Sequence, residues 1–366
     1  MITNIDAERL EHFLHAYGHN AHTHLYFMGD KQFFWEAEGF ALIVYRKAGN
    51  RRIVLGDPIG EAEAVLRVID QFIRKCRSER SVPVFYQVKA AGLALYERYG
   101  LQSVKLGEEA QINLPSFHTA GKAWLKLRTR LNKFERNGHR FEVIQPPFST
   151  ELLQELADIS DEWLGKRKEK SFSVGAFSLD YANRFPVSLL RSPDGRIDAF
   201  ASLGGDHVSE PGRNPDALPR RLTVDLMRHR AGSAHGTMDV LFLLLFAWGK
   251  EQGYEVCSLG MAPLAGACES KLARLIYKYG NKLYNFKGLY EYKNKFAPVW
   301  EDVYLVAPAA SMPITVLQLA LVINGFGQGK AAARSKSLRD LLPRVSKDAT
   351  TNCPLVQLTE SQHVHD

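Results

Sequence analysis

The sequence of 366 residues has few cysteines and no long apolar run. Its four cysteines, Cys76, Cys257, Cys268 and Cys353, follow no CxxC or other paired spacing, which excludes a disulfide scaffold and gives no sign of zinc ligands. No apolar stretch is long enough to cross a bilayer, so we expect no membrane span. The start, MITNIDAERLEHFL, lacks a basic segment followed by an apolar one, and we expect no signal peptide.

Metal-binding patterns are also missing. Five histidines crowd the first part of the chain without an HExxH motif: His12, His15, His19, His22 and His24. We expect them to lie at the surface and not to bind a metal. The sequence does have ample material for a folded core, because 45% of its residues are hydrophobic and 11% are aromatic, which excludes a disordered chain. Its length predicts two or three domains.

The hydrophobic pattern divides the chain into four parts. Residues 1–118 and 141–307 each alternate between β-rich runs and amphipathic helical segments, which predicts an α/β (α+β) fold. Residues 308–366 contain a short apolar helical segment and a basic tail, whose last fifteen residues we expect to be disordered. The apolar segment, 312–326, is suited either to rest on a bilayer surface or to pack on the second domain.

The remaining part, residues 119–140, holds most of the net charge of +7. Seven Lys/Arg and one acid lie between Lys122 and Arg140. Trp124, Leu127 and Phe134 share one face of the predicted helix with Leu131. Such a helix is either an ordinary solvated surface or an apolar-anchored helix that follows the phosphates of a nucleic acid.

One stretch has the order of a known fold. TVDLMRHR, AGSAHG, MDVLFLLLFAWGKEQG and YEVCSLG read as a strand, a glycine loop, a long helix and a strand. This order resembles the core of the GNAT acyltransferase fold, in which the loop and the helix N-terminus cradle a pyrophosphate. LALYERYGL in the first part is similar to the closing helix and turn of that fold. The resemblance implies two tandem GNAT-like domains, 1–118 and 141–307, joined by the basic amphipathic helix of residues 119–140.

The glycine loop departs from acetyl-CoA-dependent members of that fold. Those enzymes carry Gln/Arg-x-x-Gly-x-Gly/Ala, whereas Ala231 and Ser233 stand three residues after Arg228 and Arg230. We therefore expect no acetyl-CoA.

Longer motifs are more specific. MGDKQFFW, VLGDPIG, FYQV, LGEEAQINL, GKAWLKLRTRLNKFERNG, ISDEWLGKRKEKSFSVG, VDLMRHR, GTMDVLF, WGKEQGY, YNFKGLYEYKNKF and PVWEDVYL occur in this order. Together they resemble the C-terminal cytosolic domain of the multiple peptide resistance factor family, bacterial phosphatidylglycerol lysyl- or alanyltransferases. The resemblance covers roughly residues 24–307.

The resemblance implies a function. A member transfers an aminoacyl group, lysyl by family frequency or else alanyl, from aminoacyl-tRNA to a glycerol hydroxyl of phosphatidylglycerol. The product lowers the negative charge of the membrane and gives resistance to cationic antimicrobial peptides. The reaction exchanges one ester for another, so we expect no cofactor and no metal. We expect a soluble domain at the cytoplasmic face of the bacterial inner membrane, without the N-terminal transmembrane flippase domain usual in the family.

The same resemblance supplies candidate catalytic residues. Asp225 and Arg228 come from VDLMR, and we expect Asp225 to act as a base or to orient the substrate amine, and Arg228 to bind phosphate or an oxyanion. Because residues three apart point to opposite faces of a regular strand, both reach one pocket only at a bulge or a strand end. Lys293 and Glu301 come from YKNKF and the motif after it; Lys293 is assigned to phosphate or carbonyl, and Glu301 to the aminoacyl ammonium. A surface Asp–Arg pair and an exposed lysine-rich loop are the structural alternatives.

Two further groups of residues are assigned to substrates. The tRNA candidates are Lys122, Lys126, Arg128, Arg130, Lys133 and Arg136 in the basic helix, and Lys166, Arg167, Lys168 and Lys170 in the second basic loop. Tyr290, Tyr292 and Lys295 are candidates for a lipid or aminoacyl pocket, with Tyr284 and Phe286, although half of these aromatics are expected to be core. Asp30, Lys31 and Asp57 are expected to stabilise turns.

Two other functions fit the pattern. The chain can be an aminoacyl-tRNA-dependent transferase acting on a peptide or protein, as in related tandem GNAT-like enzymes. It can also be a non-catalytic module that binds tRNA or membrane.

Overall fold

The computed structural model describes residues 4–205, 220–263 and 286–325. Tyr284 and the basic tail after residue 325, including the predicted disorder of its last fifteen residues, lie outside the described residues. No helix of the described residues is both long and apolar enough to cross a membrane.

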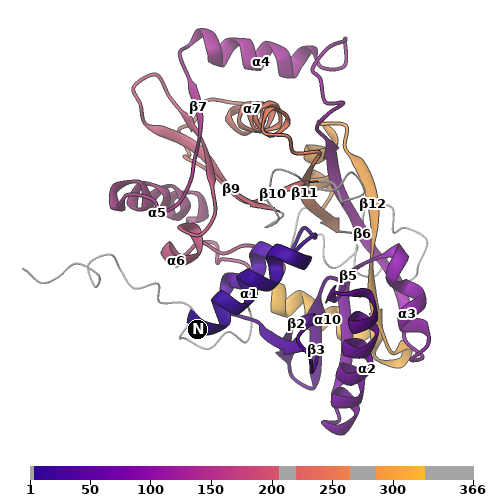
Figure 1. Cartoon of the computed structure of the whole chain (residues 1–366). Helices are drawn as coiled ribbons and strands as arrows, with labels where there is room; N and C mark the ends of the chain where they lie inside the picture. Colours follow the sequence, from indigo (N-terminus) through magenta and orange to yellow (C-terminus); the bar gives the residue numbers. More distant parts are fainter. Residues whose placement is uncertain (1–3, 206–219, 264–285, 326–366) are drawn as a thin grey trace, which may run out of the picture.

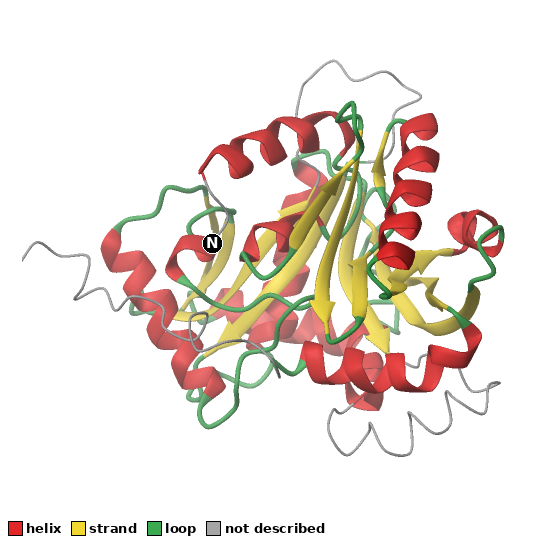
Figure 2. Cartoon of the chain, turned by 90° about the horizontal axis from the view of Figure 1, so that it is seen from below, coloured by secondary structure: helices red, strands yellow, loops and turns green. Residues whose placement is uncertain are grey.

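A twelve-stranded sheet runs through the described part of the chain (Figures 1 and 2). Its order is β1-β2-β3-β5-β12-β6-β11-β10-β9-β8-β7, with β4 beside β2. The strands are β1 (Gln32–Trp35), β2 (Ala41–Ala48), β3 (Arg51–Leu55), β4 (Ile59–Gly60), β5 (Val82–Lys89), β6 (Gln102–Asn113), β7 (Arg140–Ile144), β8 (Val187–Arg191), β9 (Ile197–Gly205), β10 (Arg221–His229), β11 (Val256–Pro263) and β12 (Val299–Ala307). The α/β fold class predicted from the pattern is confirmed.

Helices cover both faces of the sheet (Figure 2). In the first half, α2 and α3 pack on one face and α1 and α10 on the other; in the second half, α4 and α7 oppose α5 and α6. The helices are α1 (Asn4–Tyr17), α2 (Ala62–Ser78), α3 (Leu93–Glu97), α4 (Leu125–Arg136), α5 (Thr150–Leu164), α6 (Leu179–Ala182), α7 (Thr237–Glu251), α9 (Phe286–Asn294) and α10 (Met312–Ile323), with short 3-10 turns η1 (Thr23–Met28), η2 (Ala90–Gly92) and η3 (Ala309–Ser311).

The strands of the two halves interleave at the centre of the sheet. β12, the last strand, lies between β5 and β6, and β6 in turn pairs with β11. The sheet is therefore continuous across the predicted linker at 119–140, and the division into domains at 118 and 141 stays a prediction. The interleaving brings Glu109 on β6 and Glu301 on β12 opposite each other in register.

The sheet opens between β10 and β11. These parallel strands pair over only three positions, ending at Thr223 and Ser258. Each strand then has an irregularity, between Val224 and Met227 in β10 and between Ser258 and Met261 in β11. The strand, loop, helix and strand predicted for residues 223–260 are present as β10, α7 and β11. Of the two possibilities considered for Asp225, a bulge or a strand end, the register shift between Val224 and Met227 corresponds to the bulge.

The basic helix α4 has the predicted apolar face. Leu127 and Phe134 are buried, while Trp124 and Leu131 pack partly buried against the same core. The helix lies against α7 at one extremity of the molecule, remote from α10 (Figure 1). The apolar segment that forms α10 packs on the first half of the sheet, where Met312, Leu319 and Val322 are buried.

Candidate functional site

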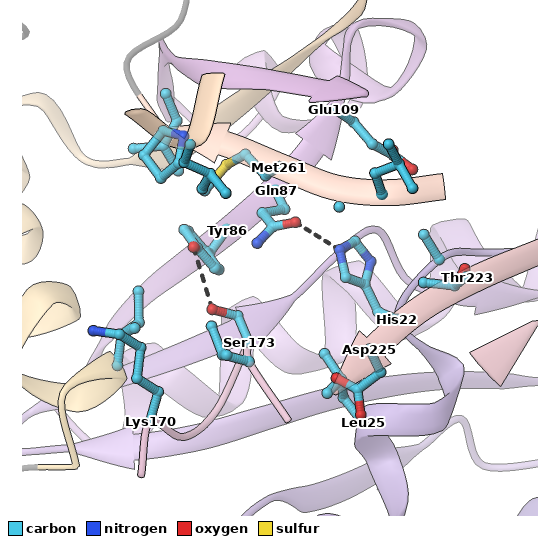
Figure 3. Close-up of a pocket in the computed structure, with 18 of the residues that line it drawn as sticks. His22, Leu25, Tyr86, Gln87, Glu109, Lys170, Ser173, Thr223, Asp225 and Met261 are labelled. Carbon is cyan, nitrogen blue, oxygen red and sulfur yellow. Dashed lines mark hydrogen bonds between the residues drawn. The ribbon is translucent and has the colours of Figure 1, made fainter. Parts of the chain in front are cut away.

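A mostly apolar cavity of about 280 Å³ lies where β10 and β11 separate. Figure 3 shows part of its wall, with Glu109 and Lys170 on opposite sides. Its apolar lining comes from η1, β6, β10, β11, α9 and α10: Leu25, Leu106, Val224, Met227, Leu259, Met261, Leu289, Val316, Leu319 and Ile323. Its ionisable lining is His22, His24, Glu109, Lys170, Asp225 and Lys293.

A second cavity, of about 400 Å³, is more polar than the first and is called the polar cavity below. Its lining includes Asp57, Lys89, Glu109, Arg221 and Glu301. The two cavities have Ala21, His22, Gln87 and Glu109 in common. These four residues therefore form a wall that the two cavities share, so the cavities adjoin there.

Asp225 is buried in the wall of the apolar cavity and is fully engaged. Its carboxylate accepts hydrogen bonds from the Tyr181 hydroxyl, at 2.8 Å, and the Gly175 amide, at 3.1 Å, and lies 3.6 Å from His24 Nε2. Burial raises the pKa of this carboxyl, but the three contacts outweigh burial and hold the pKa below its ordinary value. Asp225 is thus an ionised anchor for two other segments, and a weak proton acceptor.

Arg228 lies on the same strand and faces the same loop. Its guanidinium donates to both carboxylate oxygens of Glu169, at 2.9 and 3.2 Å, and stacks 4.0 Å from the Trp163 ring centre. Arg228 and Asp225 thereby attach the loop of residues 165–177 to β10, because Asp225 binds Gly175. Arg228 does not line the apolar cavity.

Lys293 is buried in the wall of the apolar cavity. Its ammonium group donates to the carbonyl oxygens of Gly260 and Met261, each at 2.9 Å, at the irregularity in β11. Burial lowers the pKa of Lys293 to about 7, and Glu109 opposes this shift. At neutral pH this amine is divided between its two protonation states, which suits a group that carries a proton.

Glu109 is buried and contacts two basic side chains, Lys89 and Arg221. It accepts hydrogen bonds from Lys89 and Ser258 and lies 3.5 Å from Arg221. Burial raises its pKa, but Lys89 and Arg221 outweigh burial and lower the pKa to about 2. Lys89 also donates to Glu301, at 2.7 Å, so Glu301 lies in the polar cavity and not in the apolar one.

The expectation that all five histidines lie at the surface is wrong. His22 and His24 are 8% and 3% exposed, because η1 inserts them between the two halves of the sheet. His22 Nε2 lies 2.7 Å from Gln87 Oε1, and burial lowers the pKa of His22 to about 4 (Figure 3). Gln87 itself has φ +64°, in the left-handed region. Nothing in the local sequence marks these histidines, since their burial depends on strands far along the chain.

Tyr290, Tyr292 and Lys295 lie away from both cavities. Tyr290 stacks on Trp300 with ring centres 4.6 Å apart. Tyr292 packs among core aromatics, and Lys295 lies over its ring and 3.4 Å from Asp239. Of helix α9, Leu289 and Lys293 face the apolar cavity.

The tRNA candidates divide into two kinds. Arg130 pairs with the buried Asp239, and Arg128 donates to the carbonyls of Thr119 and Gly121, so both have partners within the protein. The exposed members are Lys122, Lys126, Lys133, Arg136, Lys166, Arg167 and Lys168. Lys170 instead lines the apolar cavity and bonds Asn324, at 2.9 Å.

The residues expected to stabilise turns form ion pairs and hydrogen bonds with other segments of the chain. Asp30 pairs with Lys31 and Arg46 and accepts the Phe172 amide at 2.9 Å. Asp57 accepts the Lys89 amide and lines the polar cavity. Glu109 and Gln87 received no role from the sequence, although both stand in motifs of the family, LGEEAQINL and FYQV.

Replacing Glu109 with Gln should destabilise the fold. The pKa of Glu109 in the folded protein, about 2, lies below the value of 4.5 for an unfolded Glu. Between these two pH values the unfolded chain binds more protons than the folded one. The contribution of Glu109 to the free energy of unfolding therefore falls as the pH drops from about 4.5 toward 2. Full loss corresponds to roughly 3 kcal/mol. Urea unfolding at pH 7 and pH 4 should show a smaller pH difference in the variant. Glu108→Gln, at the neighbouring position, is the control, and an equal effect of both variants would contradict the special role of Glu109.

The geometry first defines a class. The strand, loop, long helix and strand formed by β10, α7 and β11 are the elements predicted for a GNAT-like transferase. Residues 11–307 match the family described as phosphatidylglycerol lysyltransferase, C-terminal, and the chain belongs to this family. The resemblance found in the motifs is confirmed.

Curated relatives and a solved structure agree with this membership. Phosphatidylglycerol lysyltransferases of Bacillus subtilis strain 168 and Staphylococcus aureus strain COL are 38% and 37% identical, each over 82% of this chain. The chain spans 35% of the length of each. The structure of L-PGS from Bacillus licheniformis is 40% identical, with a TM-score of 0.80 over 88% of this chain and 98% of that one.

Proposed function

We propose that this chain transfers an aminoacyl group, with lysyl as the first candidate, from an aminoacyl-tRNA to a glycerol hydroxyl of phosphatidylglycerol. The observation that carries the proposal is the pair of adjoining cavities, one mostly apolar and the other lined by more charged side chains, which share His22, Gln87 and Glu109. The transfer requires a lipid in apolar surroundings and an aminoacyl ester in more polar surroundings to lie next to each other. Two adjoining cavities with different linings suit these two reactants. Family membership supports the lipid acceptor.

The apolar cavity suits the lipid. Its aliphatic lining from β11 and α10 can surround the glycerol backbone and the first methylene groups of the acyl chains. Lys170 supplies a cation at its wall for the phosphate of the headgroup.

The polar cavity suits an aminoacyl ester. Asp57, Glu109 and Glu301 contribute carboxylates beside Lys89 and Arg221. Lysyl esters carry two ammonium groups and alanyl esters one, so the surplus of carboxylates favours lysyl. Glu301, whose side chain is 44% exposed, is the carboxylate most accessible to an incoming ammonium.

The proposed reaction is an ester exchange. The glycerol hydroxyl oxygen bonds to the aminoacyl carbonyl carbon, the bond to the ribose oxygen breaks, and the hydroxyl proton ends on that ribose oxygen. Lys293 is the candidate proton carrier, since its amine faces the cavity with a pKa of about 7.

The exchange needs no cofactor, and the chain has features that disfavour acetyl-CoA. The buried carboxylate of Asp239 stands in the first turn of α7, where a pyrophosphate would have to bind, and Arg130 covers Gly236 at its N-terminus.

Transfer of labelled amino acid into a lipid-extractable product tests the proposal. We expect label from lysyl-tRNA to appear in phosphatidylglycerol, with less or none from alanyl-tRNA. Absence of transfer from every member of a charged-tRNA panel would refute the proposal. Label in added peptide and not in lipid would favour the peptide-acceptor alternative, and binding without turnover would favour the non-catalytic one.

The cellular consequences remain part of the proposal. Lysylation replaces a headgroup of one negative charge by one of net positive charge, which lowers the attraction of cationic peptides to the membrane. We propose that the chain acts at the cytosolic face, where charged tRNA is found, and that in longer family members a membrane domain precedes this part.

The exposed lysines of α4 and of the turn before it should contact the tRNA backbone. Replacing Lys122, Lys126 and Lys133 with Ala should raise the KM for tRNA and reduce the slope of log K against log salt by about 2–3, because each lost phosphate contact removes about 0.7–0.9. Filter binding at several salt concentrations measures the slope. A control with Arg74, Arg77 and Arg98, exposed on and beside α2 and α3, changed to Ala should keep the slope. Equal slopes in both variants would remove α4 from the interface.

A further inference from the structure

Helix α10 has two apolar faces and only one of them is covered. Val316, Leu319 and Ile323 point into the apolar cavity. On the opposite side, Ile314, Leu317 and Leu321 are 57%, 62% and 43% exposed. All the exposed residues of this helix are apolar, since Pro313 and Ala320 complete the set. A surface helix of a soluble protein ordinarily carries charge on its outer face, so this face has a partner.

The charges around α10 indicate which partner. The helix has no charged residue of its own. Arg51 is 5% exposed and its described side-chain partners are all neutral: Thr315, Gln318 and Asn50, at 2.8–3.0 Å. Lys170 bonds Asn324 just after the other end of the helix, and its pKa is lowered by burial. Two cations thus lie next to this helix, Arg51 beside its first half and Lys170 just beyond its C-terminal end.

This combination fits a bilayer better than a protein. Protein interfaces are enriched in aromatic residues and Arg at their buried centre, whereas this stripe contains only Ile and Leu. An aliphatic helix face flanked by cations is the arrangement by which a helix rests in the interface of an anionic membrane. The same helix walls the apolar cavity, so a lipid leaving the bilayer has a short path across α10.

We propose that α10 is a membrane-docking helix that inserts Ile314, Leu317 and Leu321 into an anionic bilayer and places the apolar cavity beside it. The proposal rests on the proposed function for its lipid substrate. Because α4 lies at one extremity of the molecule, remote from α10 (Figure 1), tRNA and bilayer approach different parts of the molecule.

Flotation with vesicles tests the docking. The full chain should float with equimolar phosphatidylglycerol–phosphatidylcholine vesicles and more weakly with phosphatidylcholine alone. The variant Ile314→Ser, Leu317→Ser, Leu321→Ser should lose about 100-fold in partitioning, because each side chain contributes to the buried apolar area. The matched control Phe40→Ser, Leu66→Ser changes exposed apolar residues on β2's neighbouring turn and on α2, and should float like the parent. Circular dichroism and thermal melts establish that each variant is folded.

A second arm separates docking from catalysis. Transfer to a short-chain phosphatidylglycerol dissolved as monomers should stay within about threefold in the α10 variant, while transfer to vesicles falls with partitioning. If the parent does not bind vesicles, or the folded variant loses transfer to both acceptors equally, the docking proposal is overturned. If the parent floats as expected but transfers to neither acceptor, the docking stands and the proposed function fails.

Discussion

Replacing Lys293 with Met should reduce lysyl transfer about 1,000-fold while leaving tRNA binding intact. General acid–base catalysis contributes about 10²–10⁴ in rate, and Lys293 is the ionisable group of the apolar cavity whose pKa lies near 7. The side chain is of similar length in Met, so the cavity keeps its shape. The carbonyls of Gly260 and Met261 lose a donor, and a thermal melt should record a modest decrease in stability.

The pH profile gives the sharper readout. As a base, Lys293 is active in its neutral form, so kcat/KM should rise with pH and level off above about 7. That limb should vanish in Lys293→Met, and Lys293→Arg should not restore it, because a guanidinium stays charged. Lys287→Met, exposed on the same helix, is the control and should keep rate and profile. A parental limb preserved in Lys293→Met would assign the titration to another group.

Replacing Asp225 should have the second largest effect on transfer, and the variants Asp225→Ala and Asp225→Asn should differ in stability. Asp225→Ala leaves the Tyr181 hydroxyl and the Gly175 amide without an acceptor and His24 without its neighbour. Each buried group left unpaired costs about 1–3 kcal/mol, so urea unfolding should show a loss of a few kcal/mol together with loss of transfer. Asp225→Asn keeps one oxygen acceptor and the shape, and should fold with a smaller loss.

The Asn variant decides between two roles of Asp225. If the carboxylate only positions the loop of residues 165–177, Asp225→Asn should keep measurable transfer with an altered KM for lipid, since Gly175 and Lys170 belong to that loop. If the negative charge itself acts in the reaction, kcat should fall at least about 100-fold with KM unchanged. Gly175→Ala provides an independent test, because a Cβ there would meet both Asp225 oxygens at 2.3 Å. Gly232→Ala, where a Cβ meets nothing, is its control. Normal transfer in Gly175→Ala would remove the loop from the mechanism.

Local pattern was sufficient for many elements. The apolar spacing of Trp124, Leu127, Leu131 and Phe134 defined the buried face of α4 correctly, because a helix repeats its faces within a few residues. The strand, loop, helix and strand from β10 to β11 followed in the same way. The bulge near Asp225 was only one of two possibilities left open by the sequence, and the structure does not place Asp225 and Arg228 in one cavity.

Other assignments depended on contacts between distant segments. Tyr290, Tyr292 and Lys293 are neighbours in one motif, yet only Lys293 faces the cavity, because α9 is fixed by its packing on the aromatic core. Arg130 looks like its neighbours Lys126 and Lys133 in sequence, but Asp239 on α7 engages it. Which oppositely charged residue pairs with a given side chain depends on the fold, and the local sequence does not reveal it.

By itself, the sequence determined the α/β class and the family, because these depend on local periodicity and on ordered motifs. It also nominated Asp225, Arg228, Lys293 and Glu301, of which Asp225 and Lys293 line the apolar cavity. Only the tertiary structure decided that Glu109, His22 and Gln87 stand where the two cavities meet, since strand exchange at the centre of the sheet brings β5, β6 and η1 together. It likewise decided which face of α10 is covered. Burial and pairing are properties of the packed chain, so the charge and protonation of these groups follow from the fold.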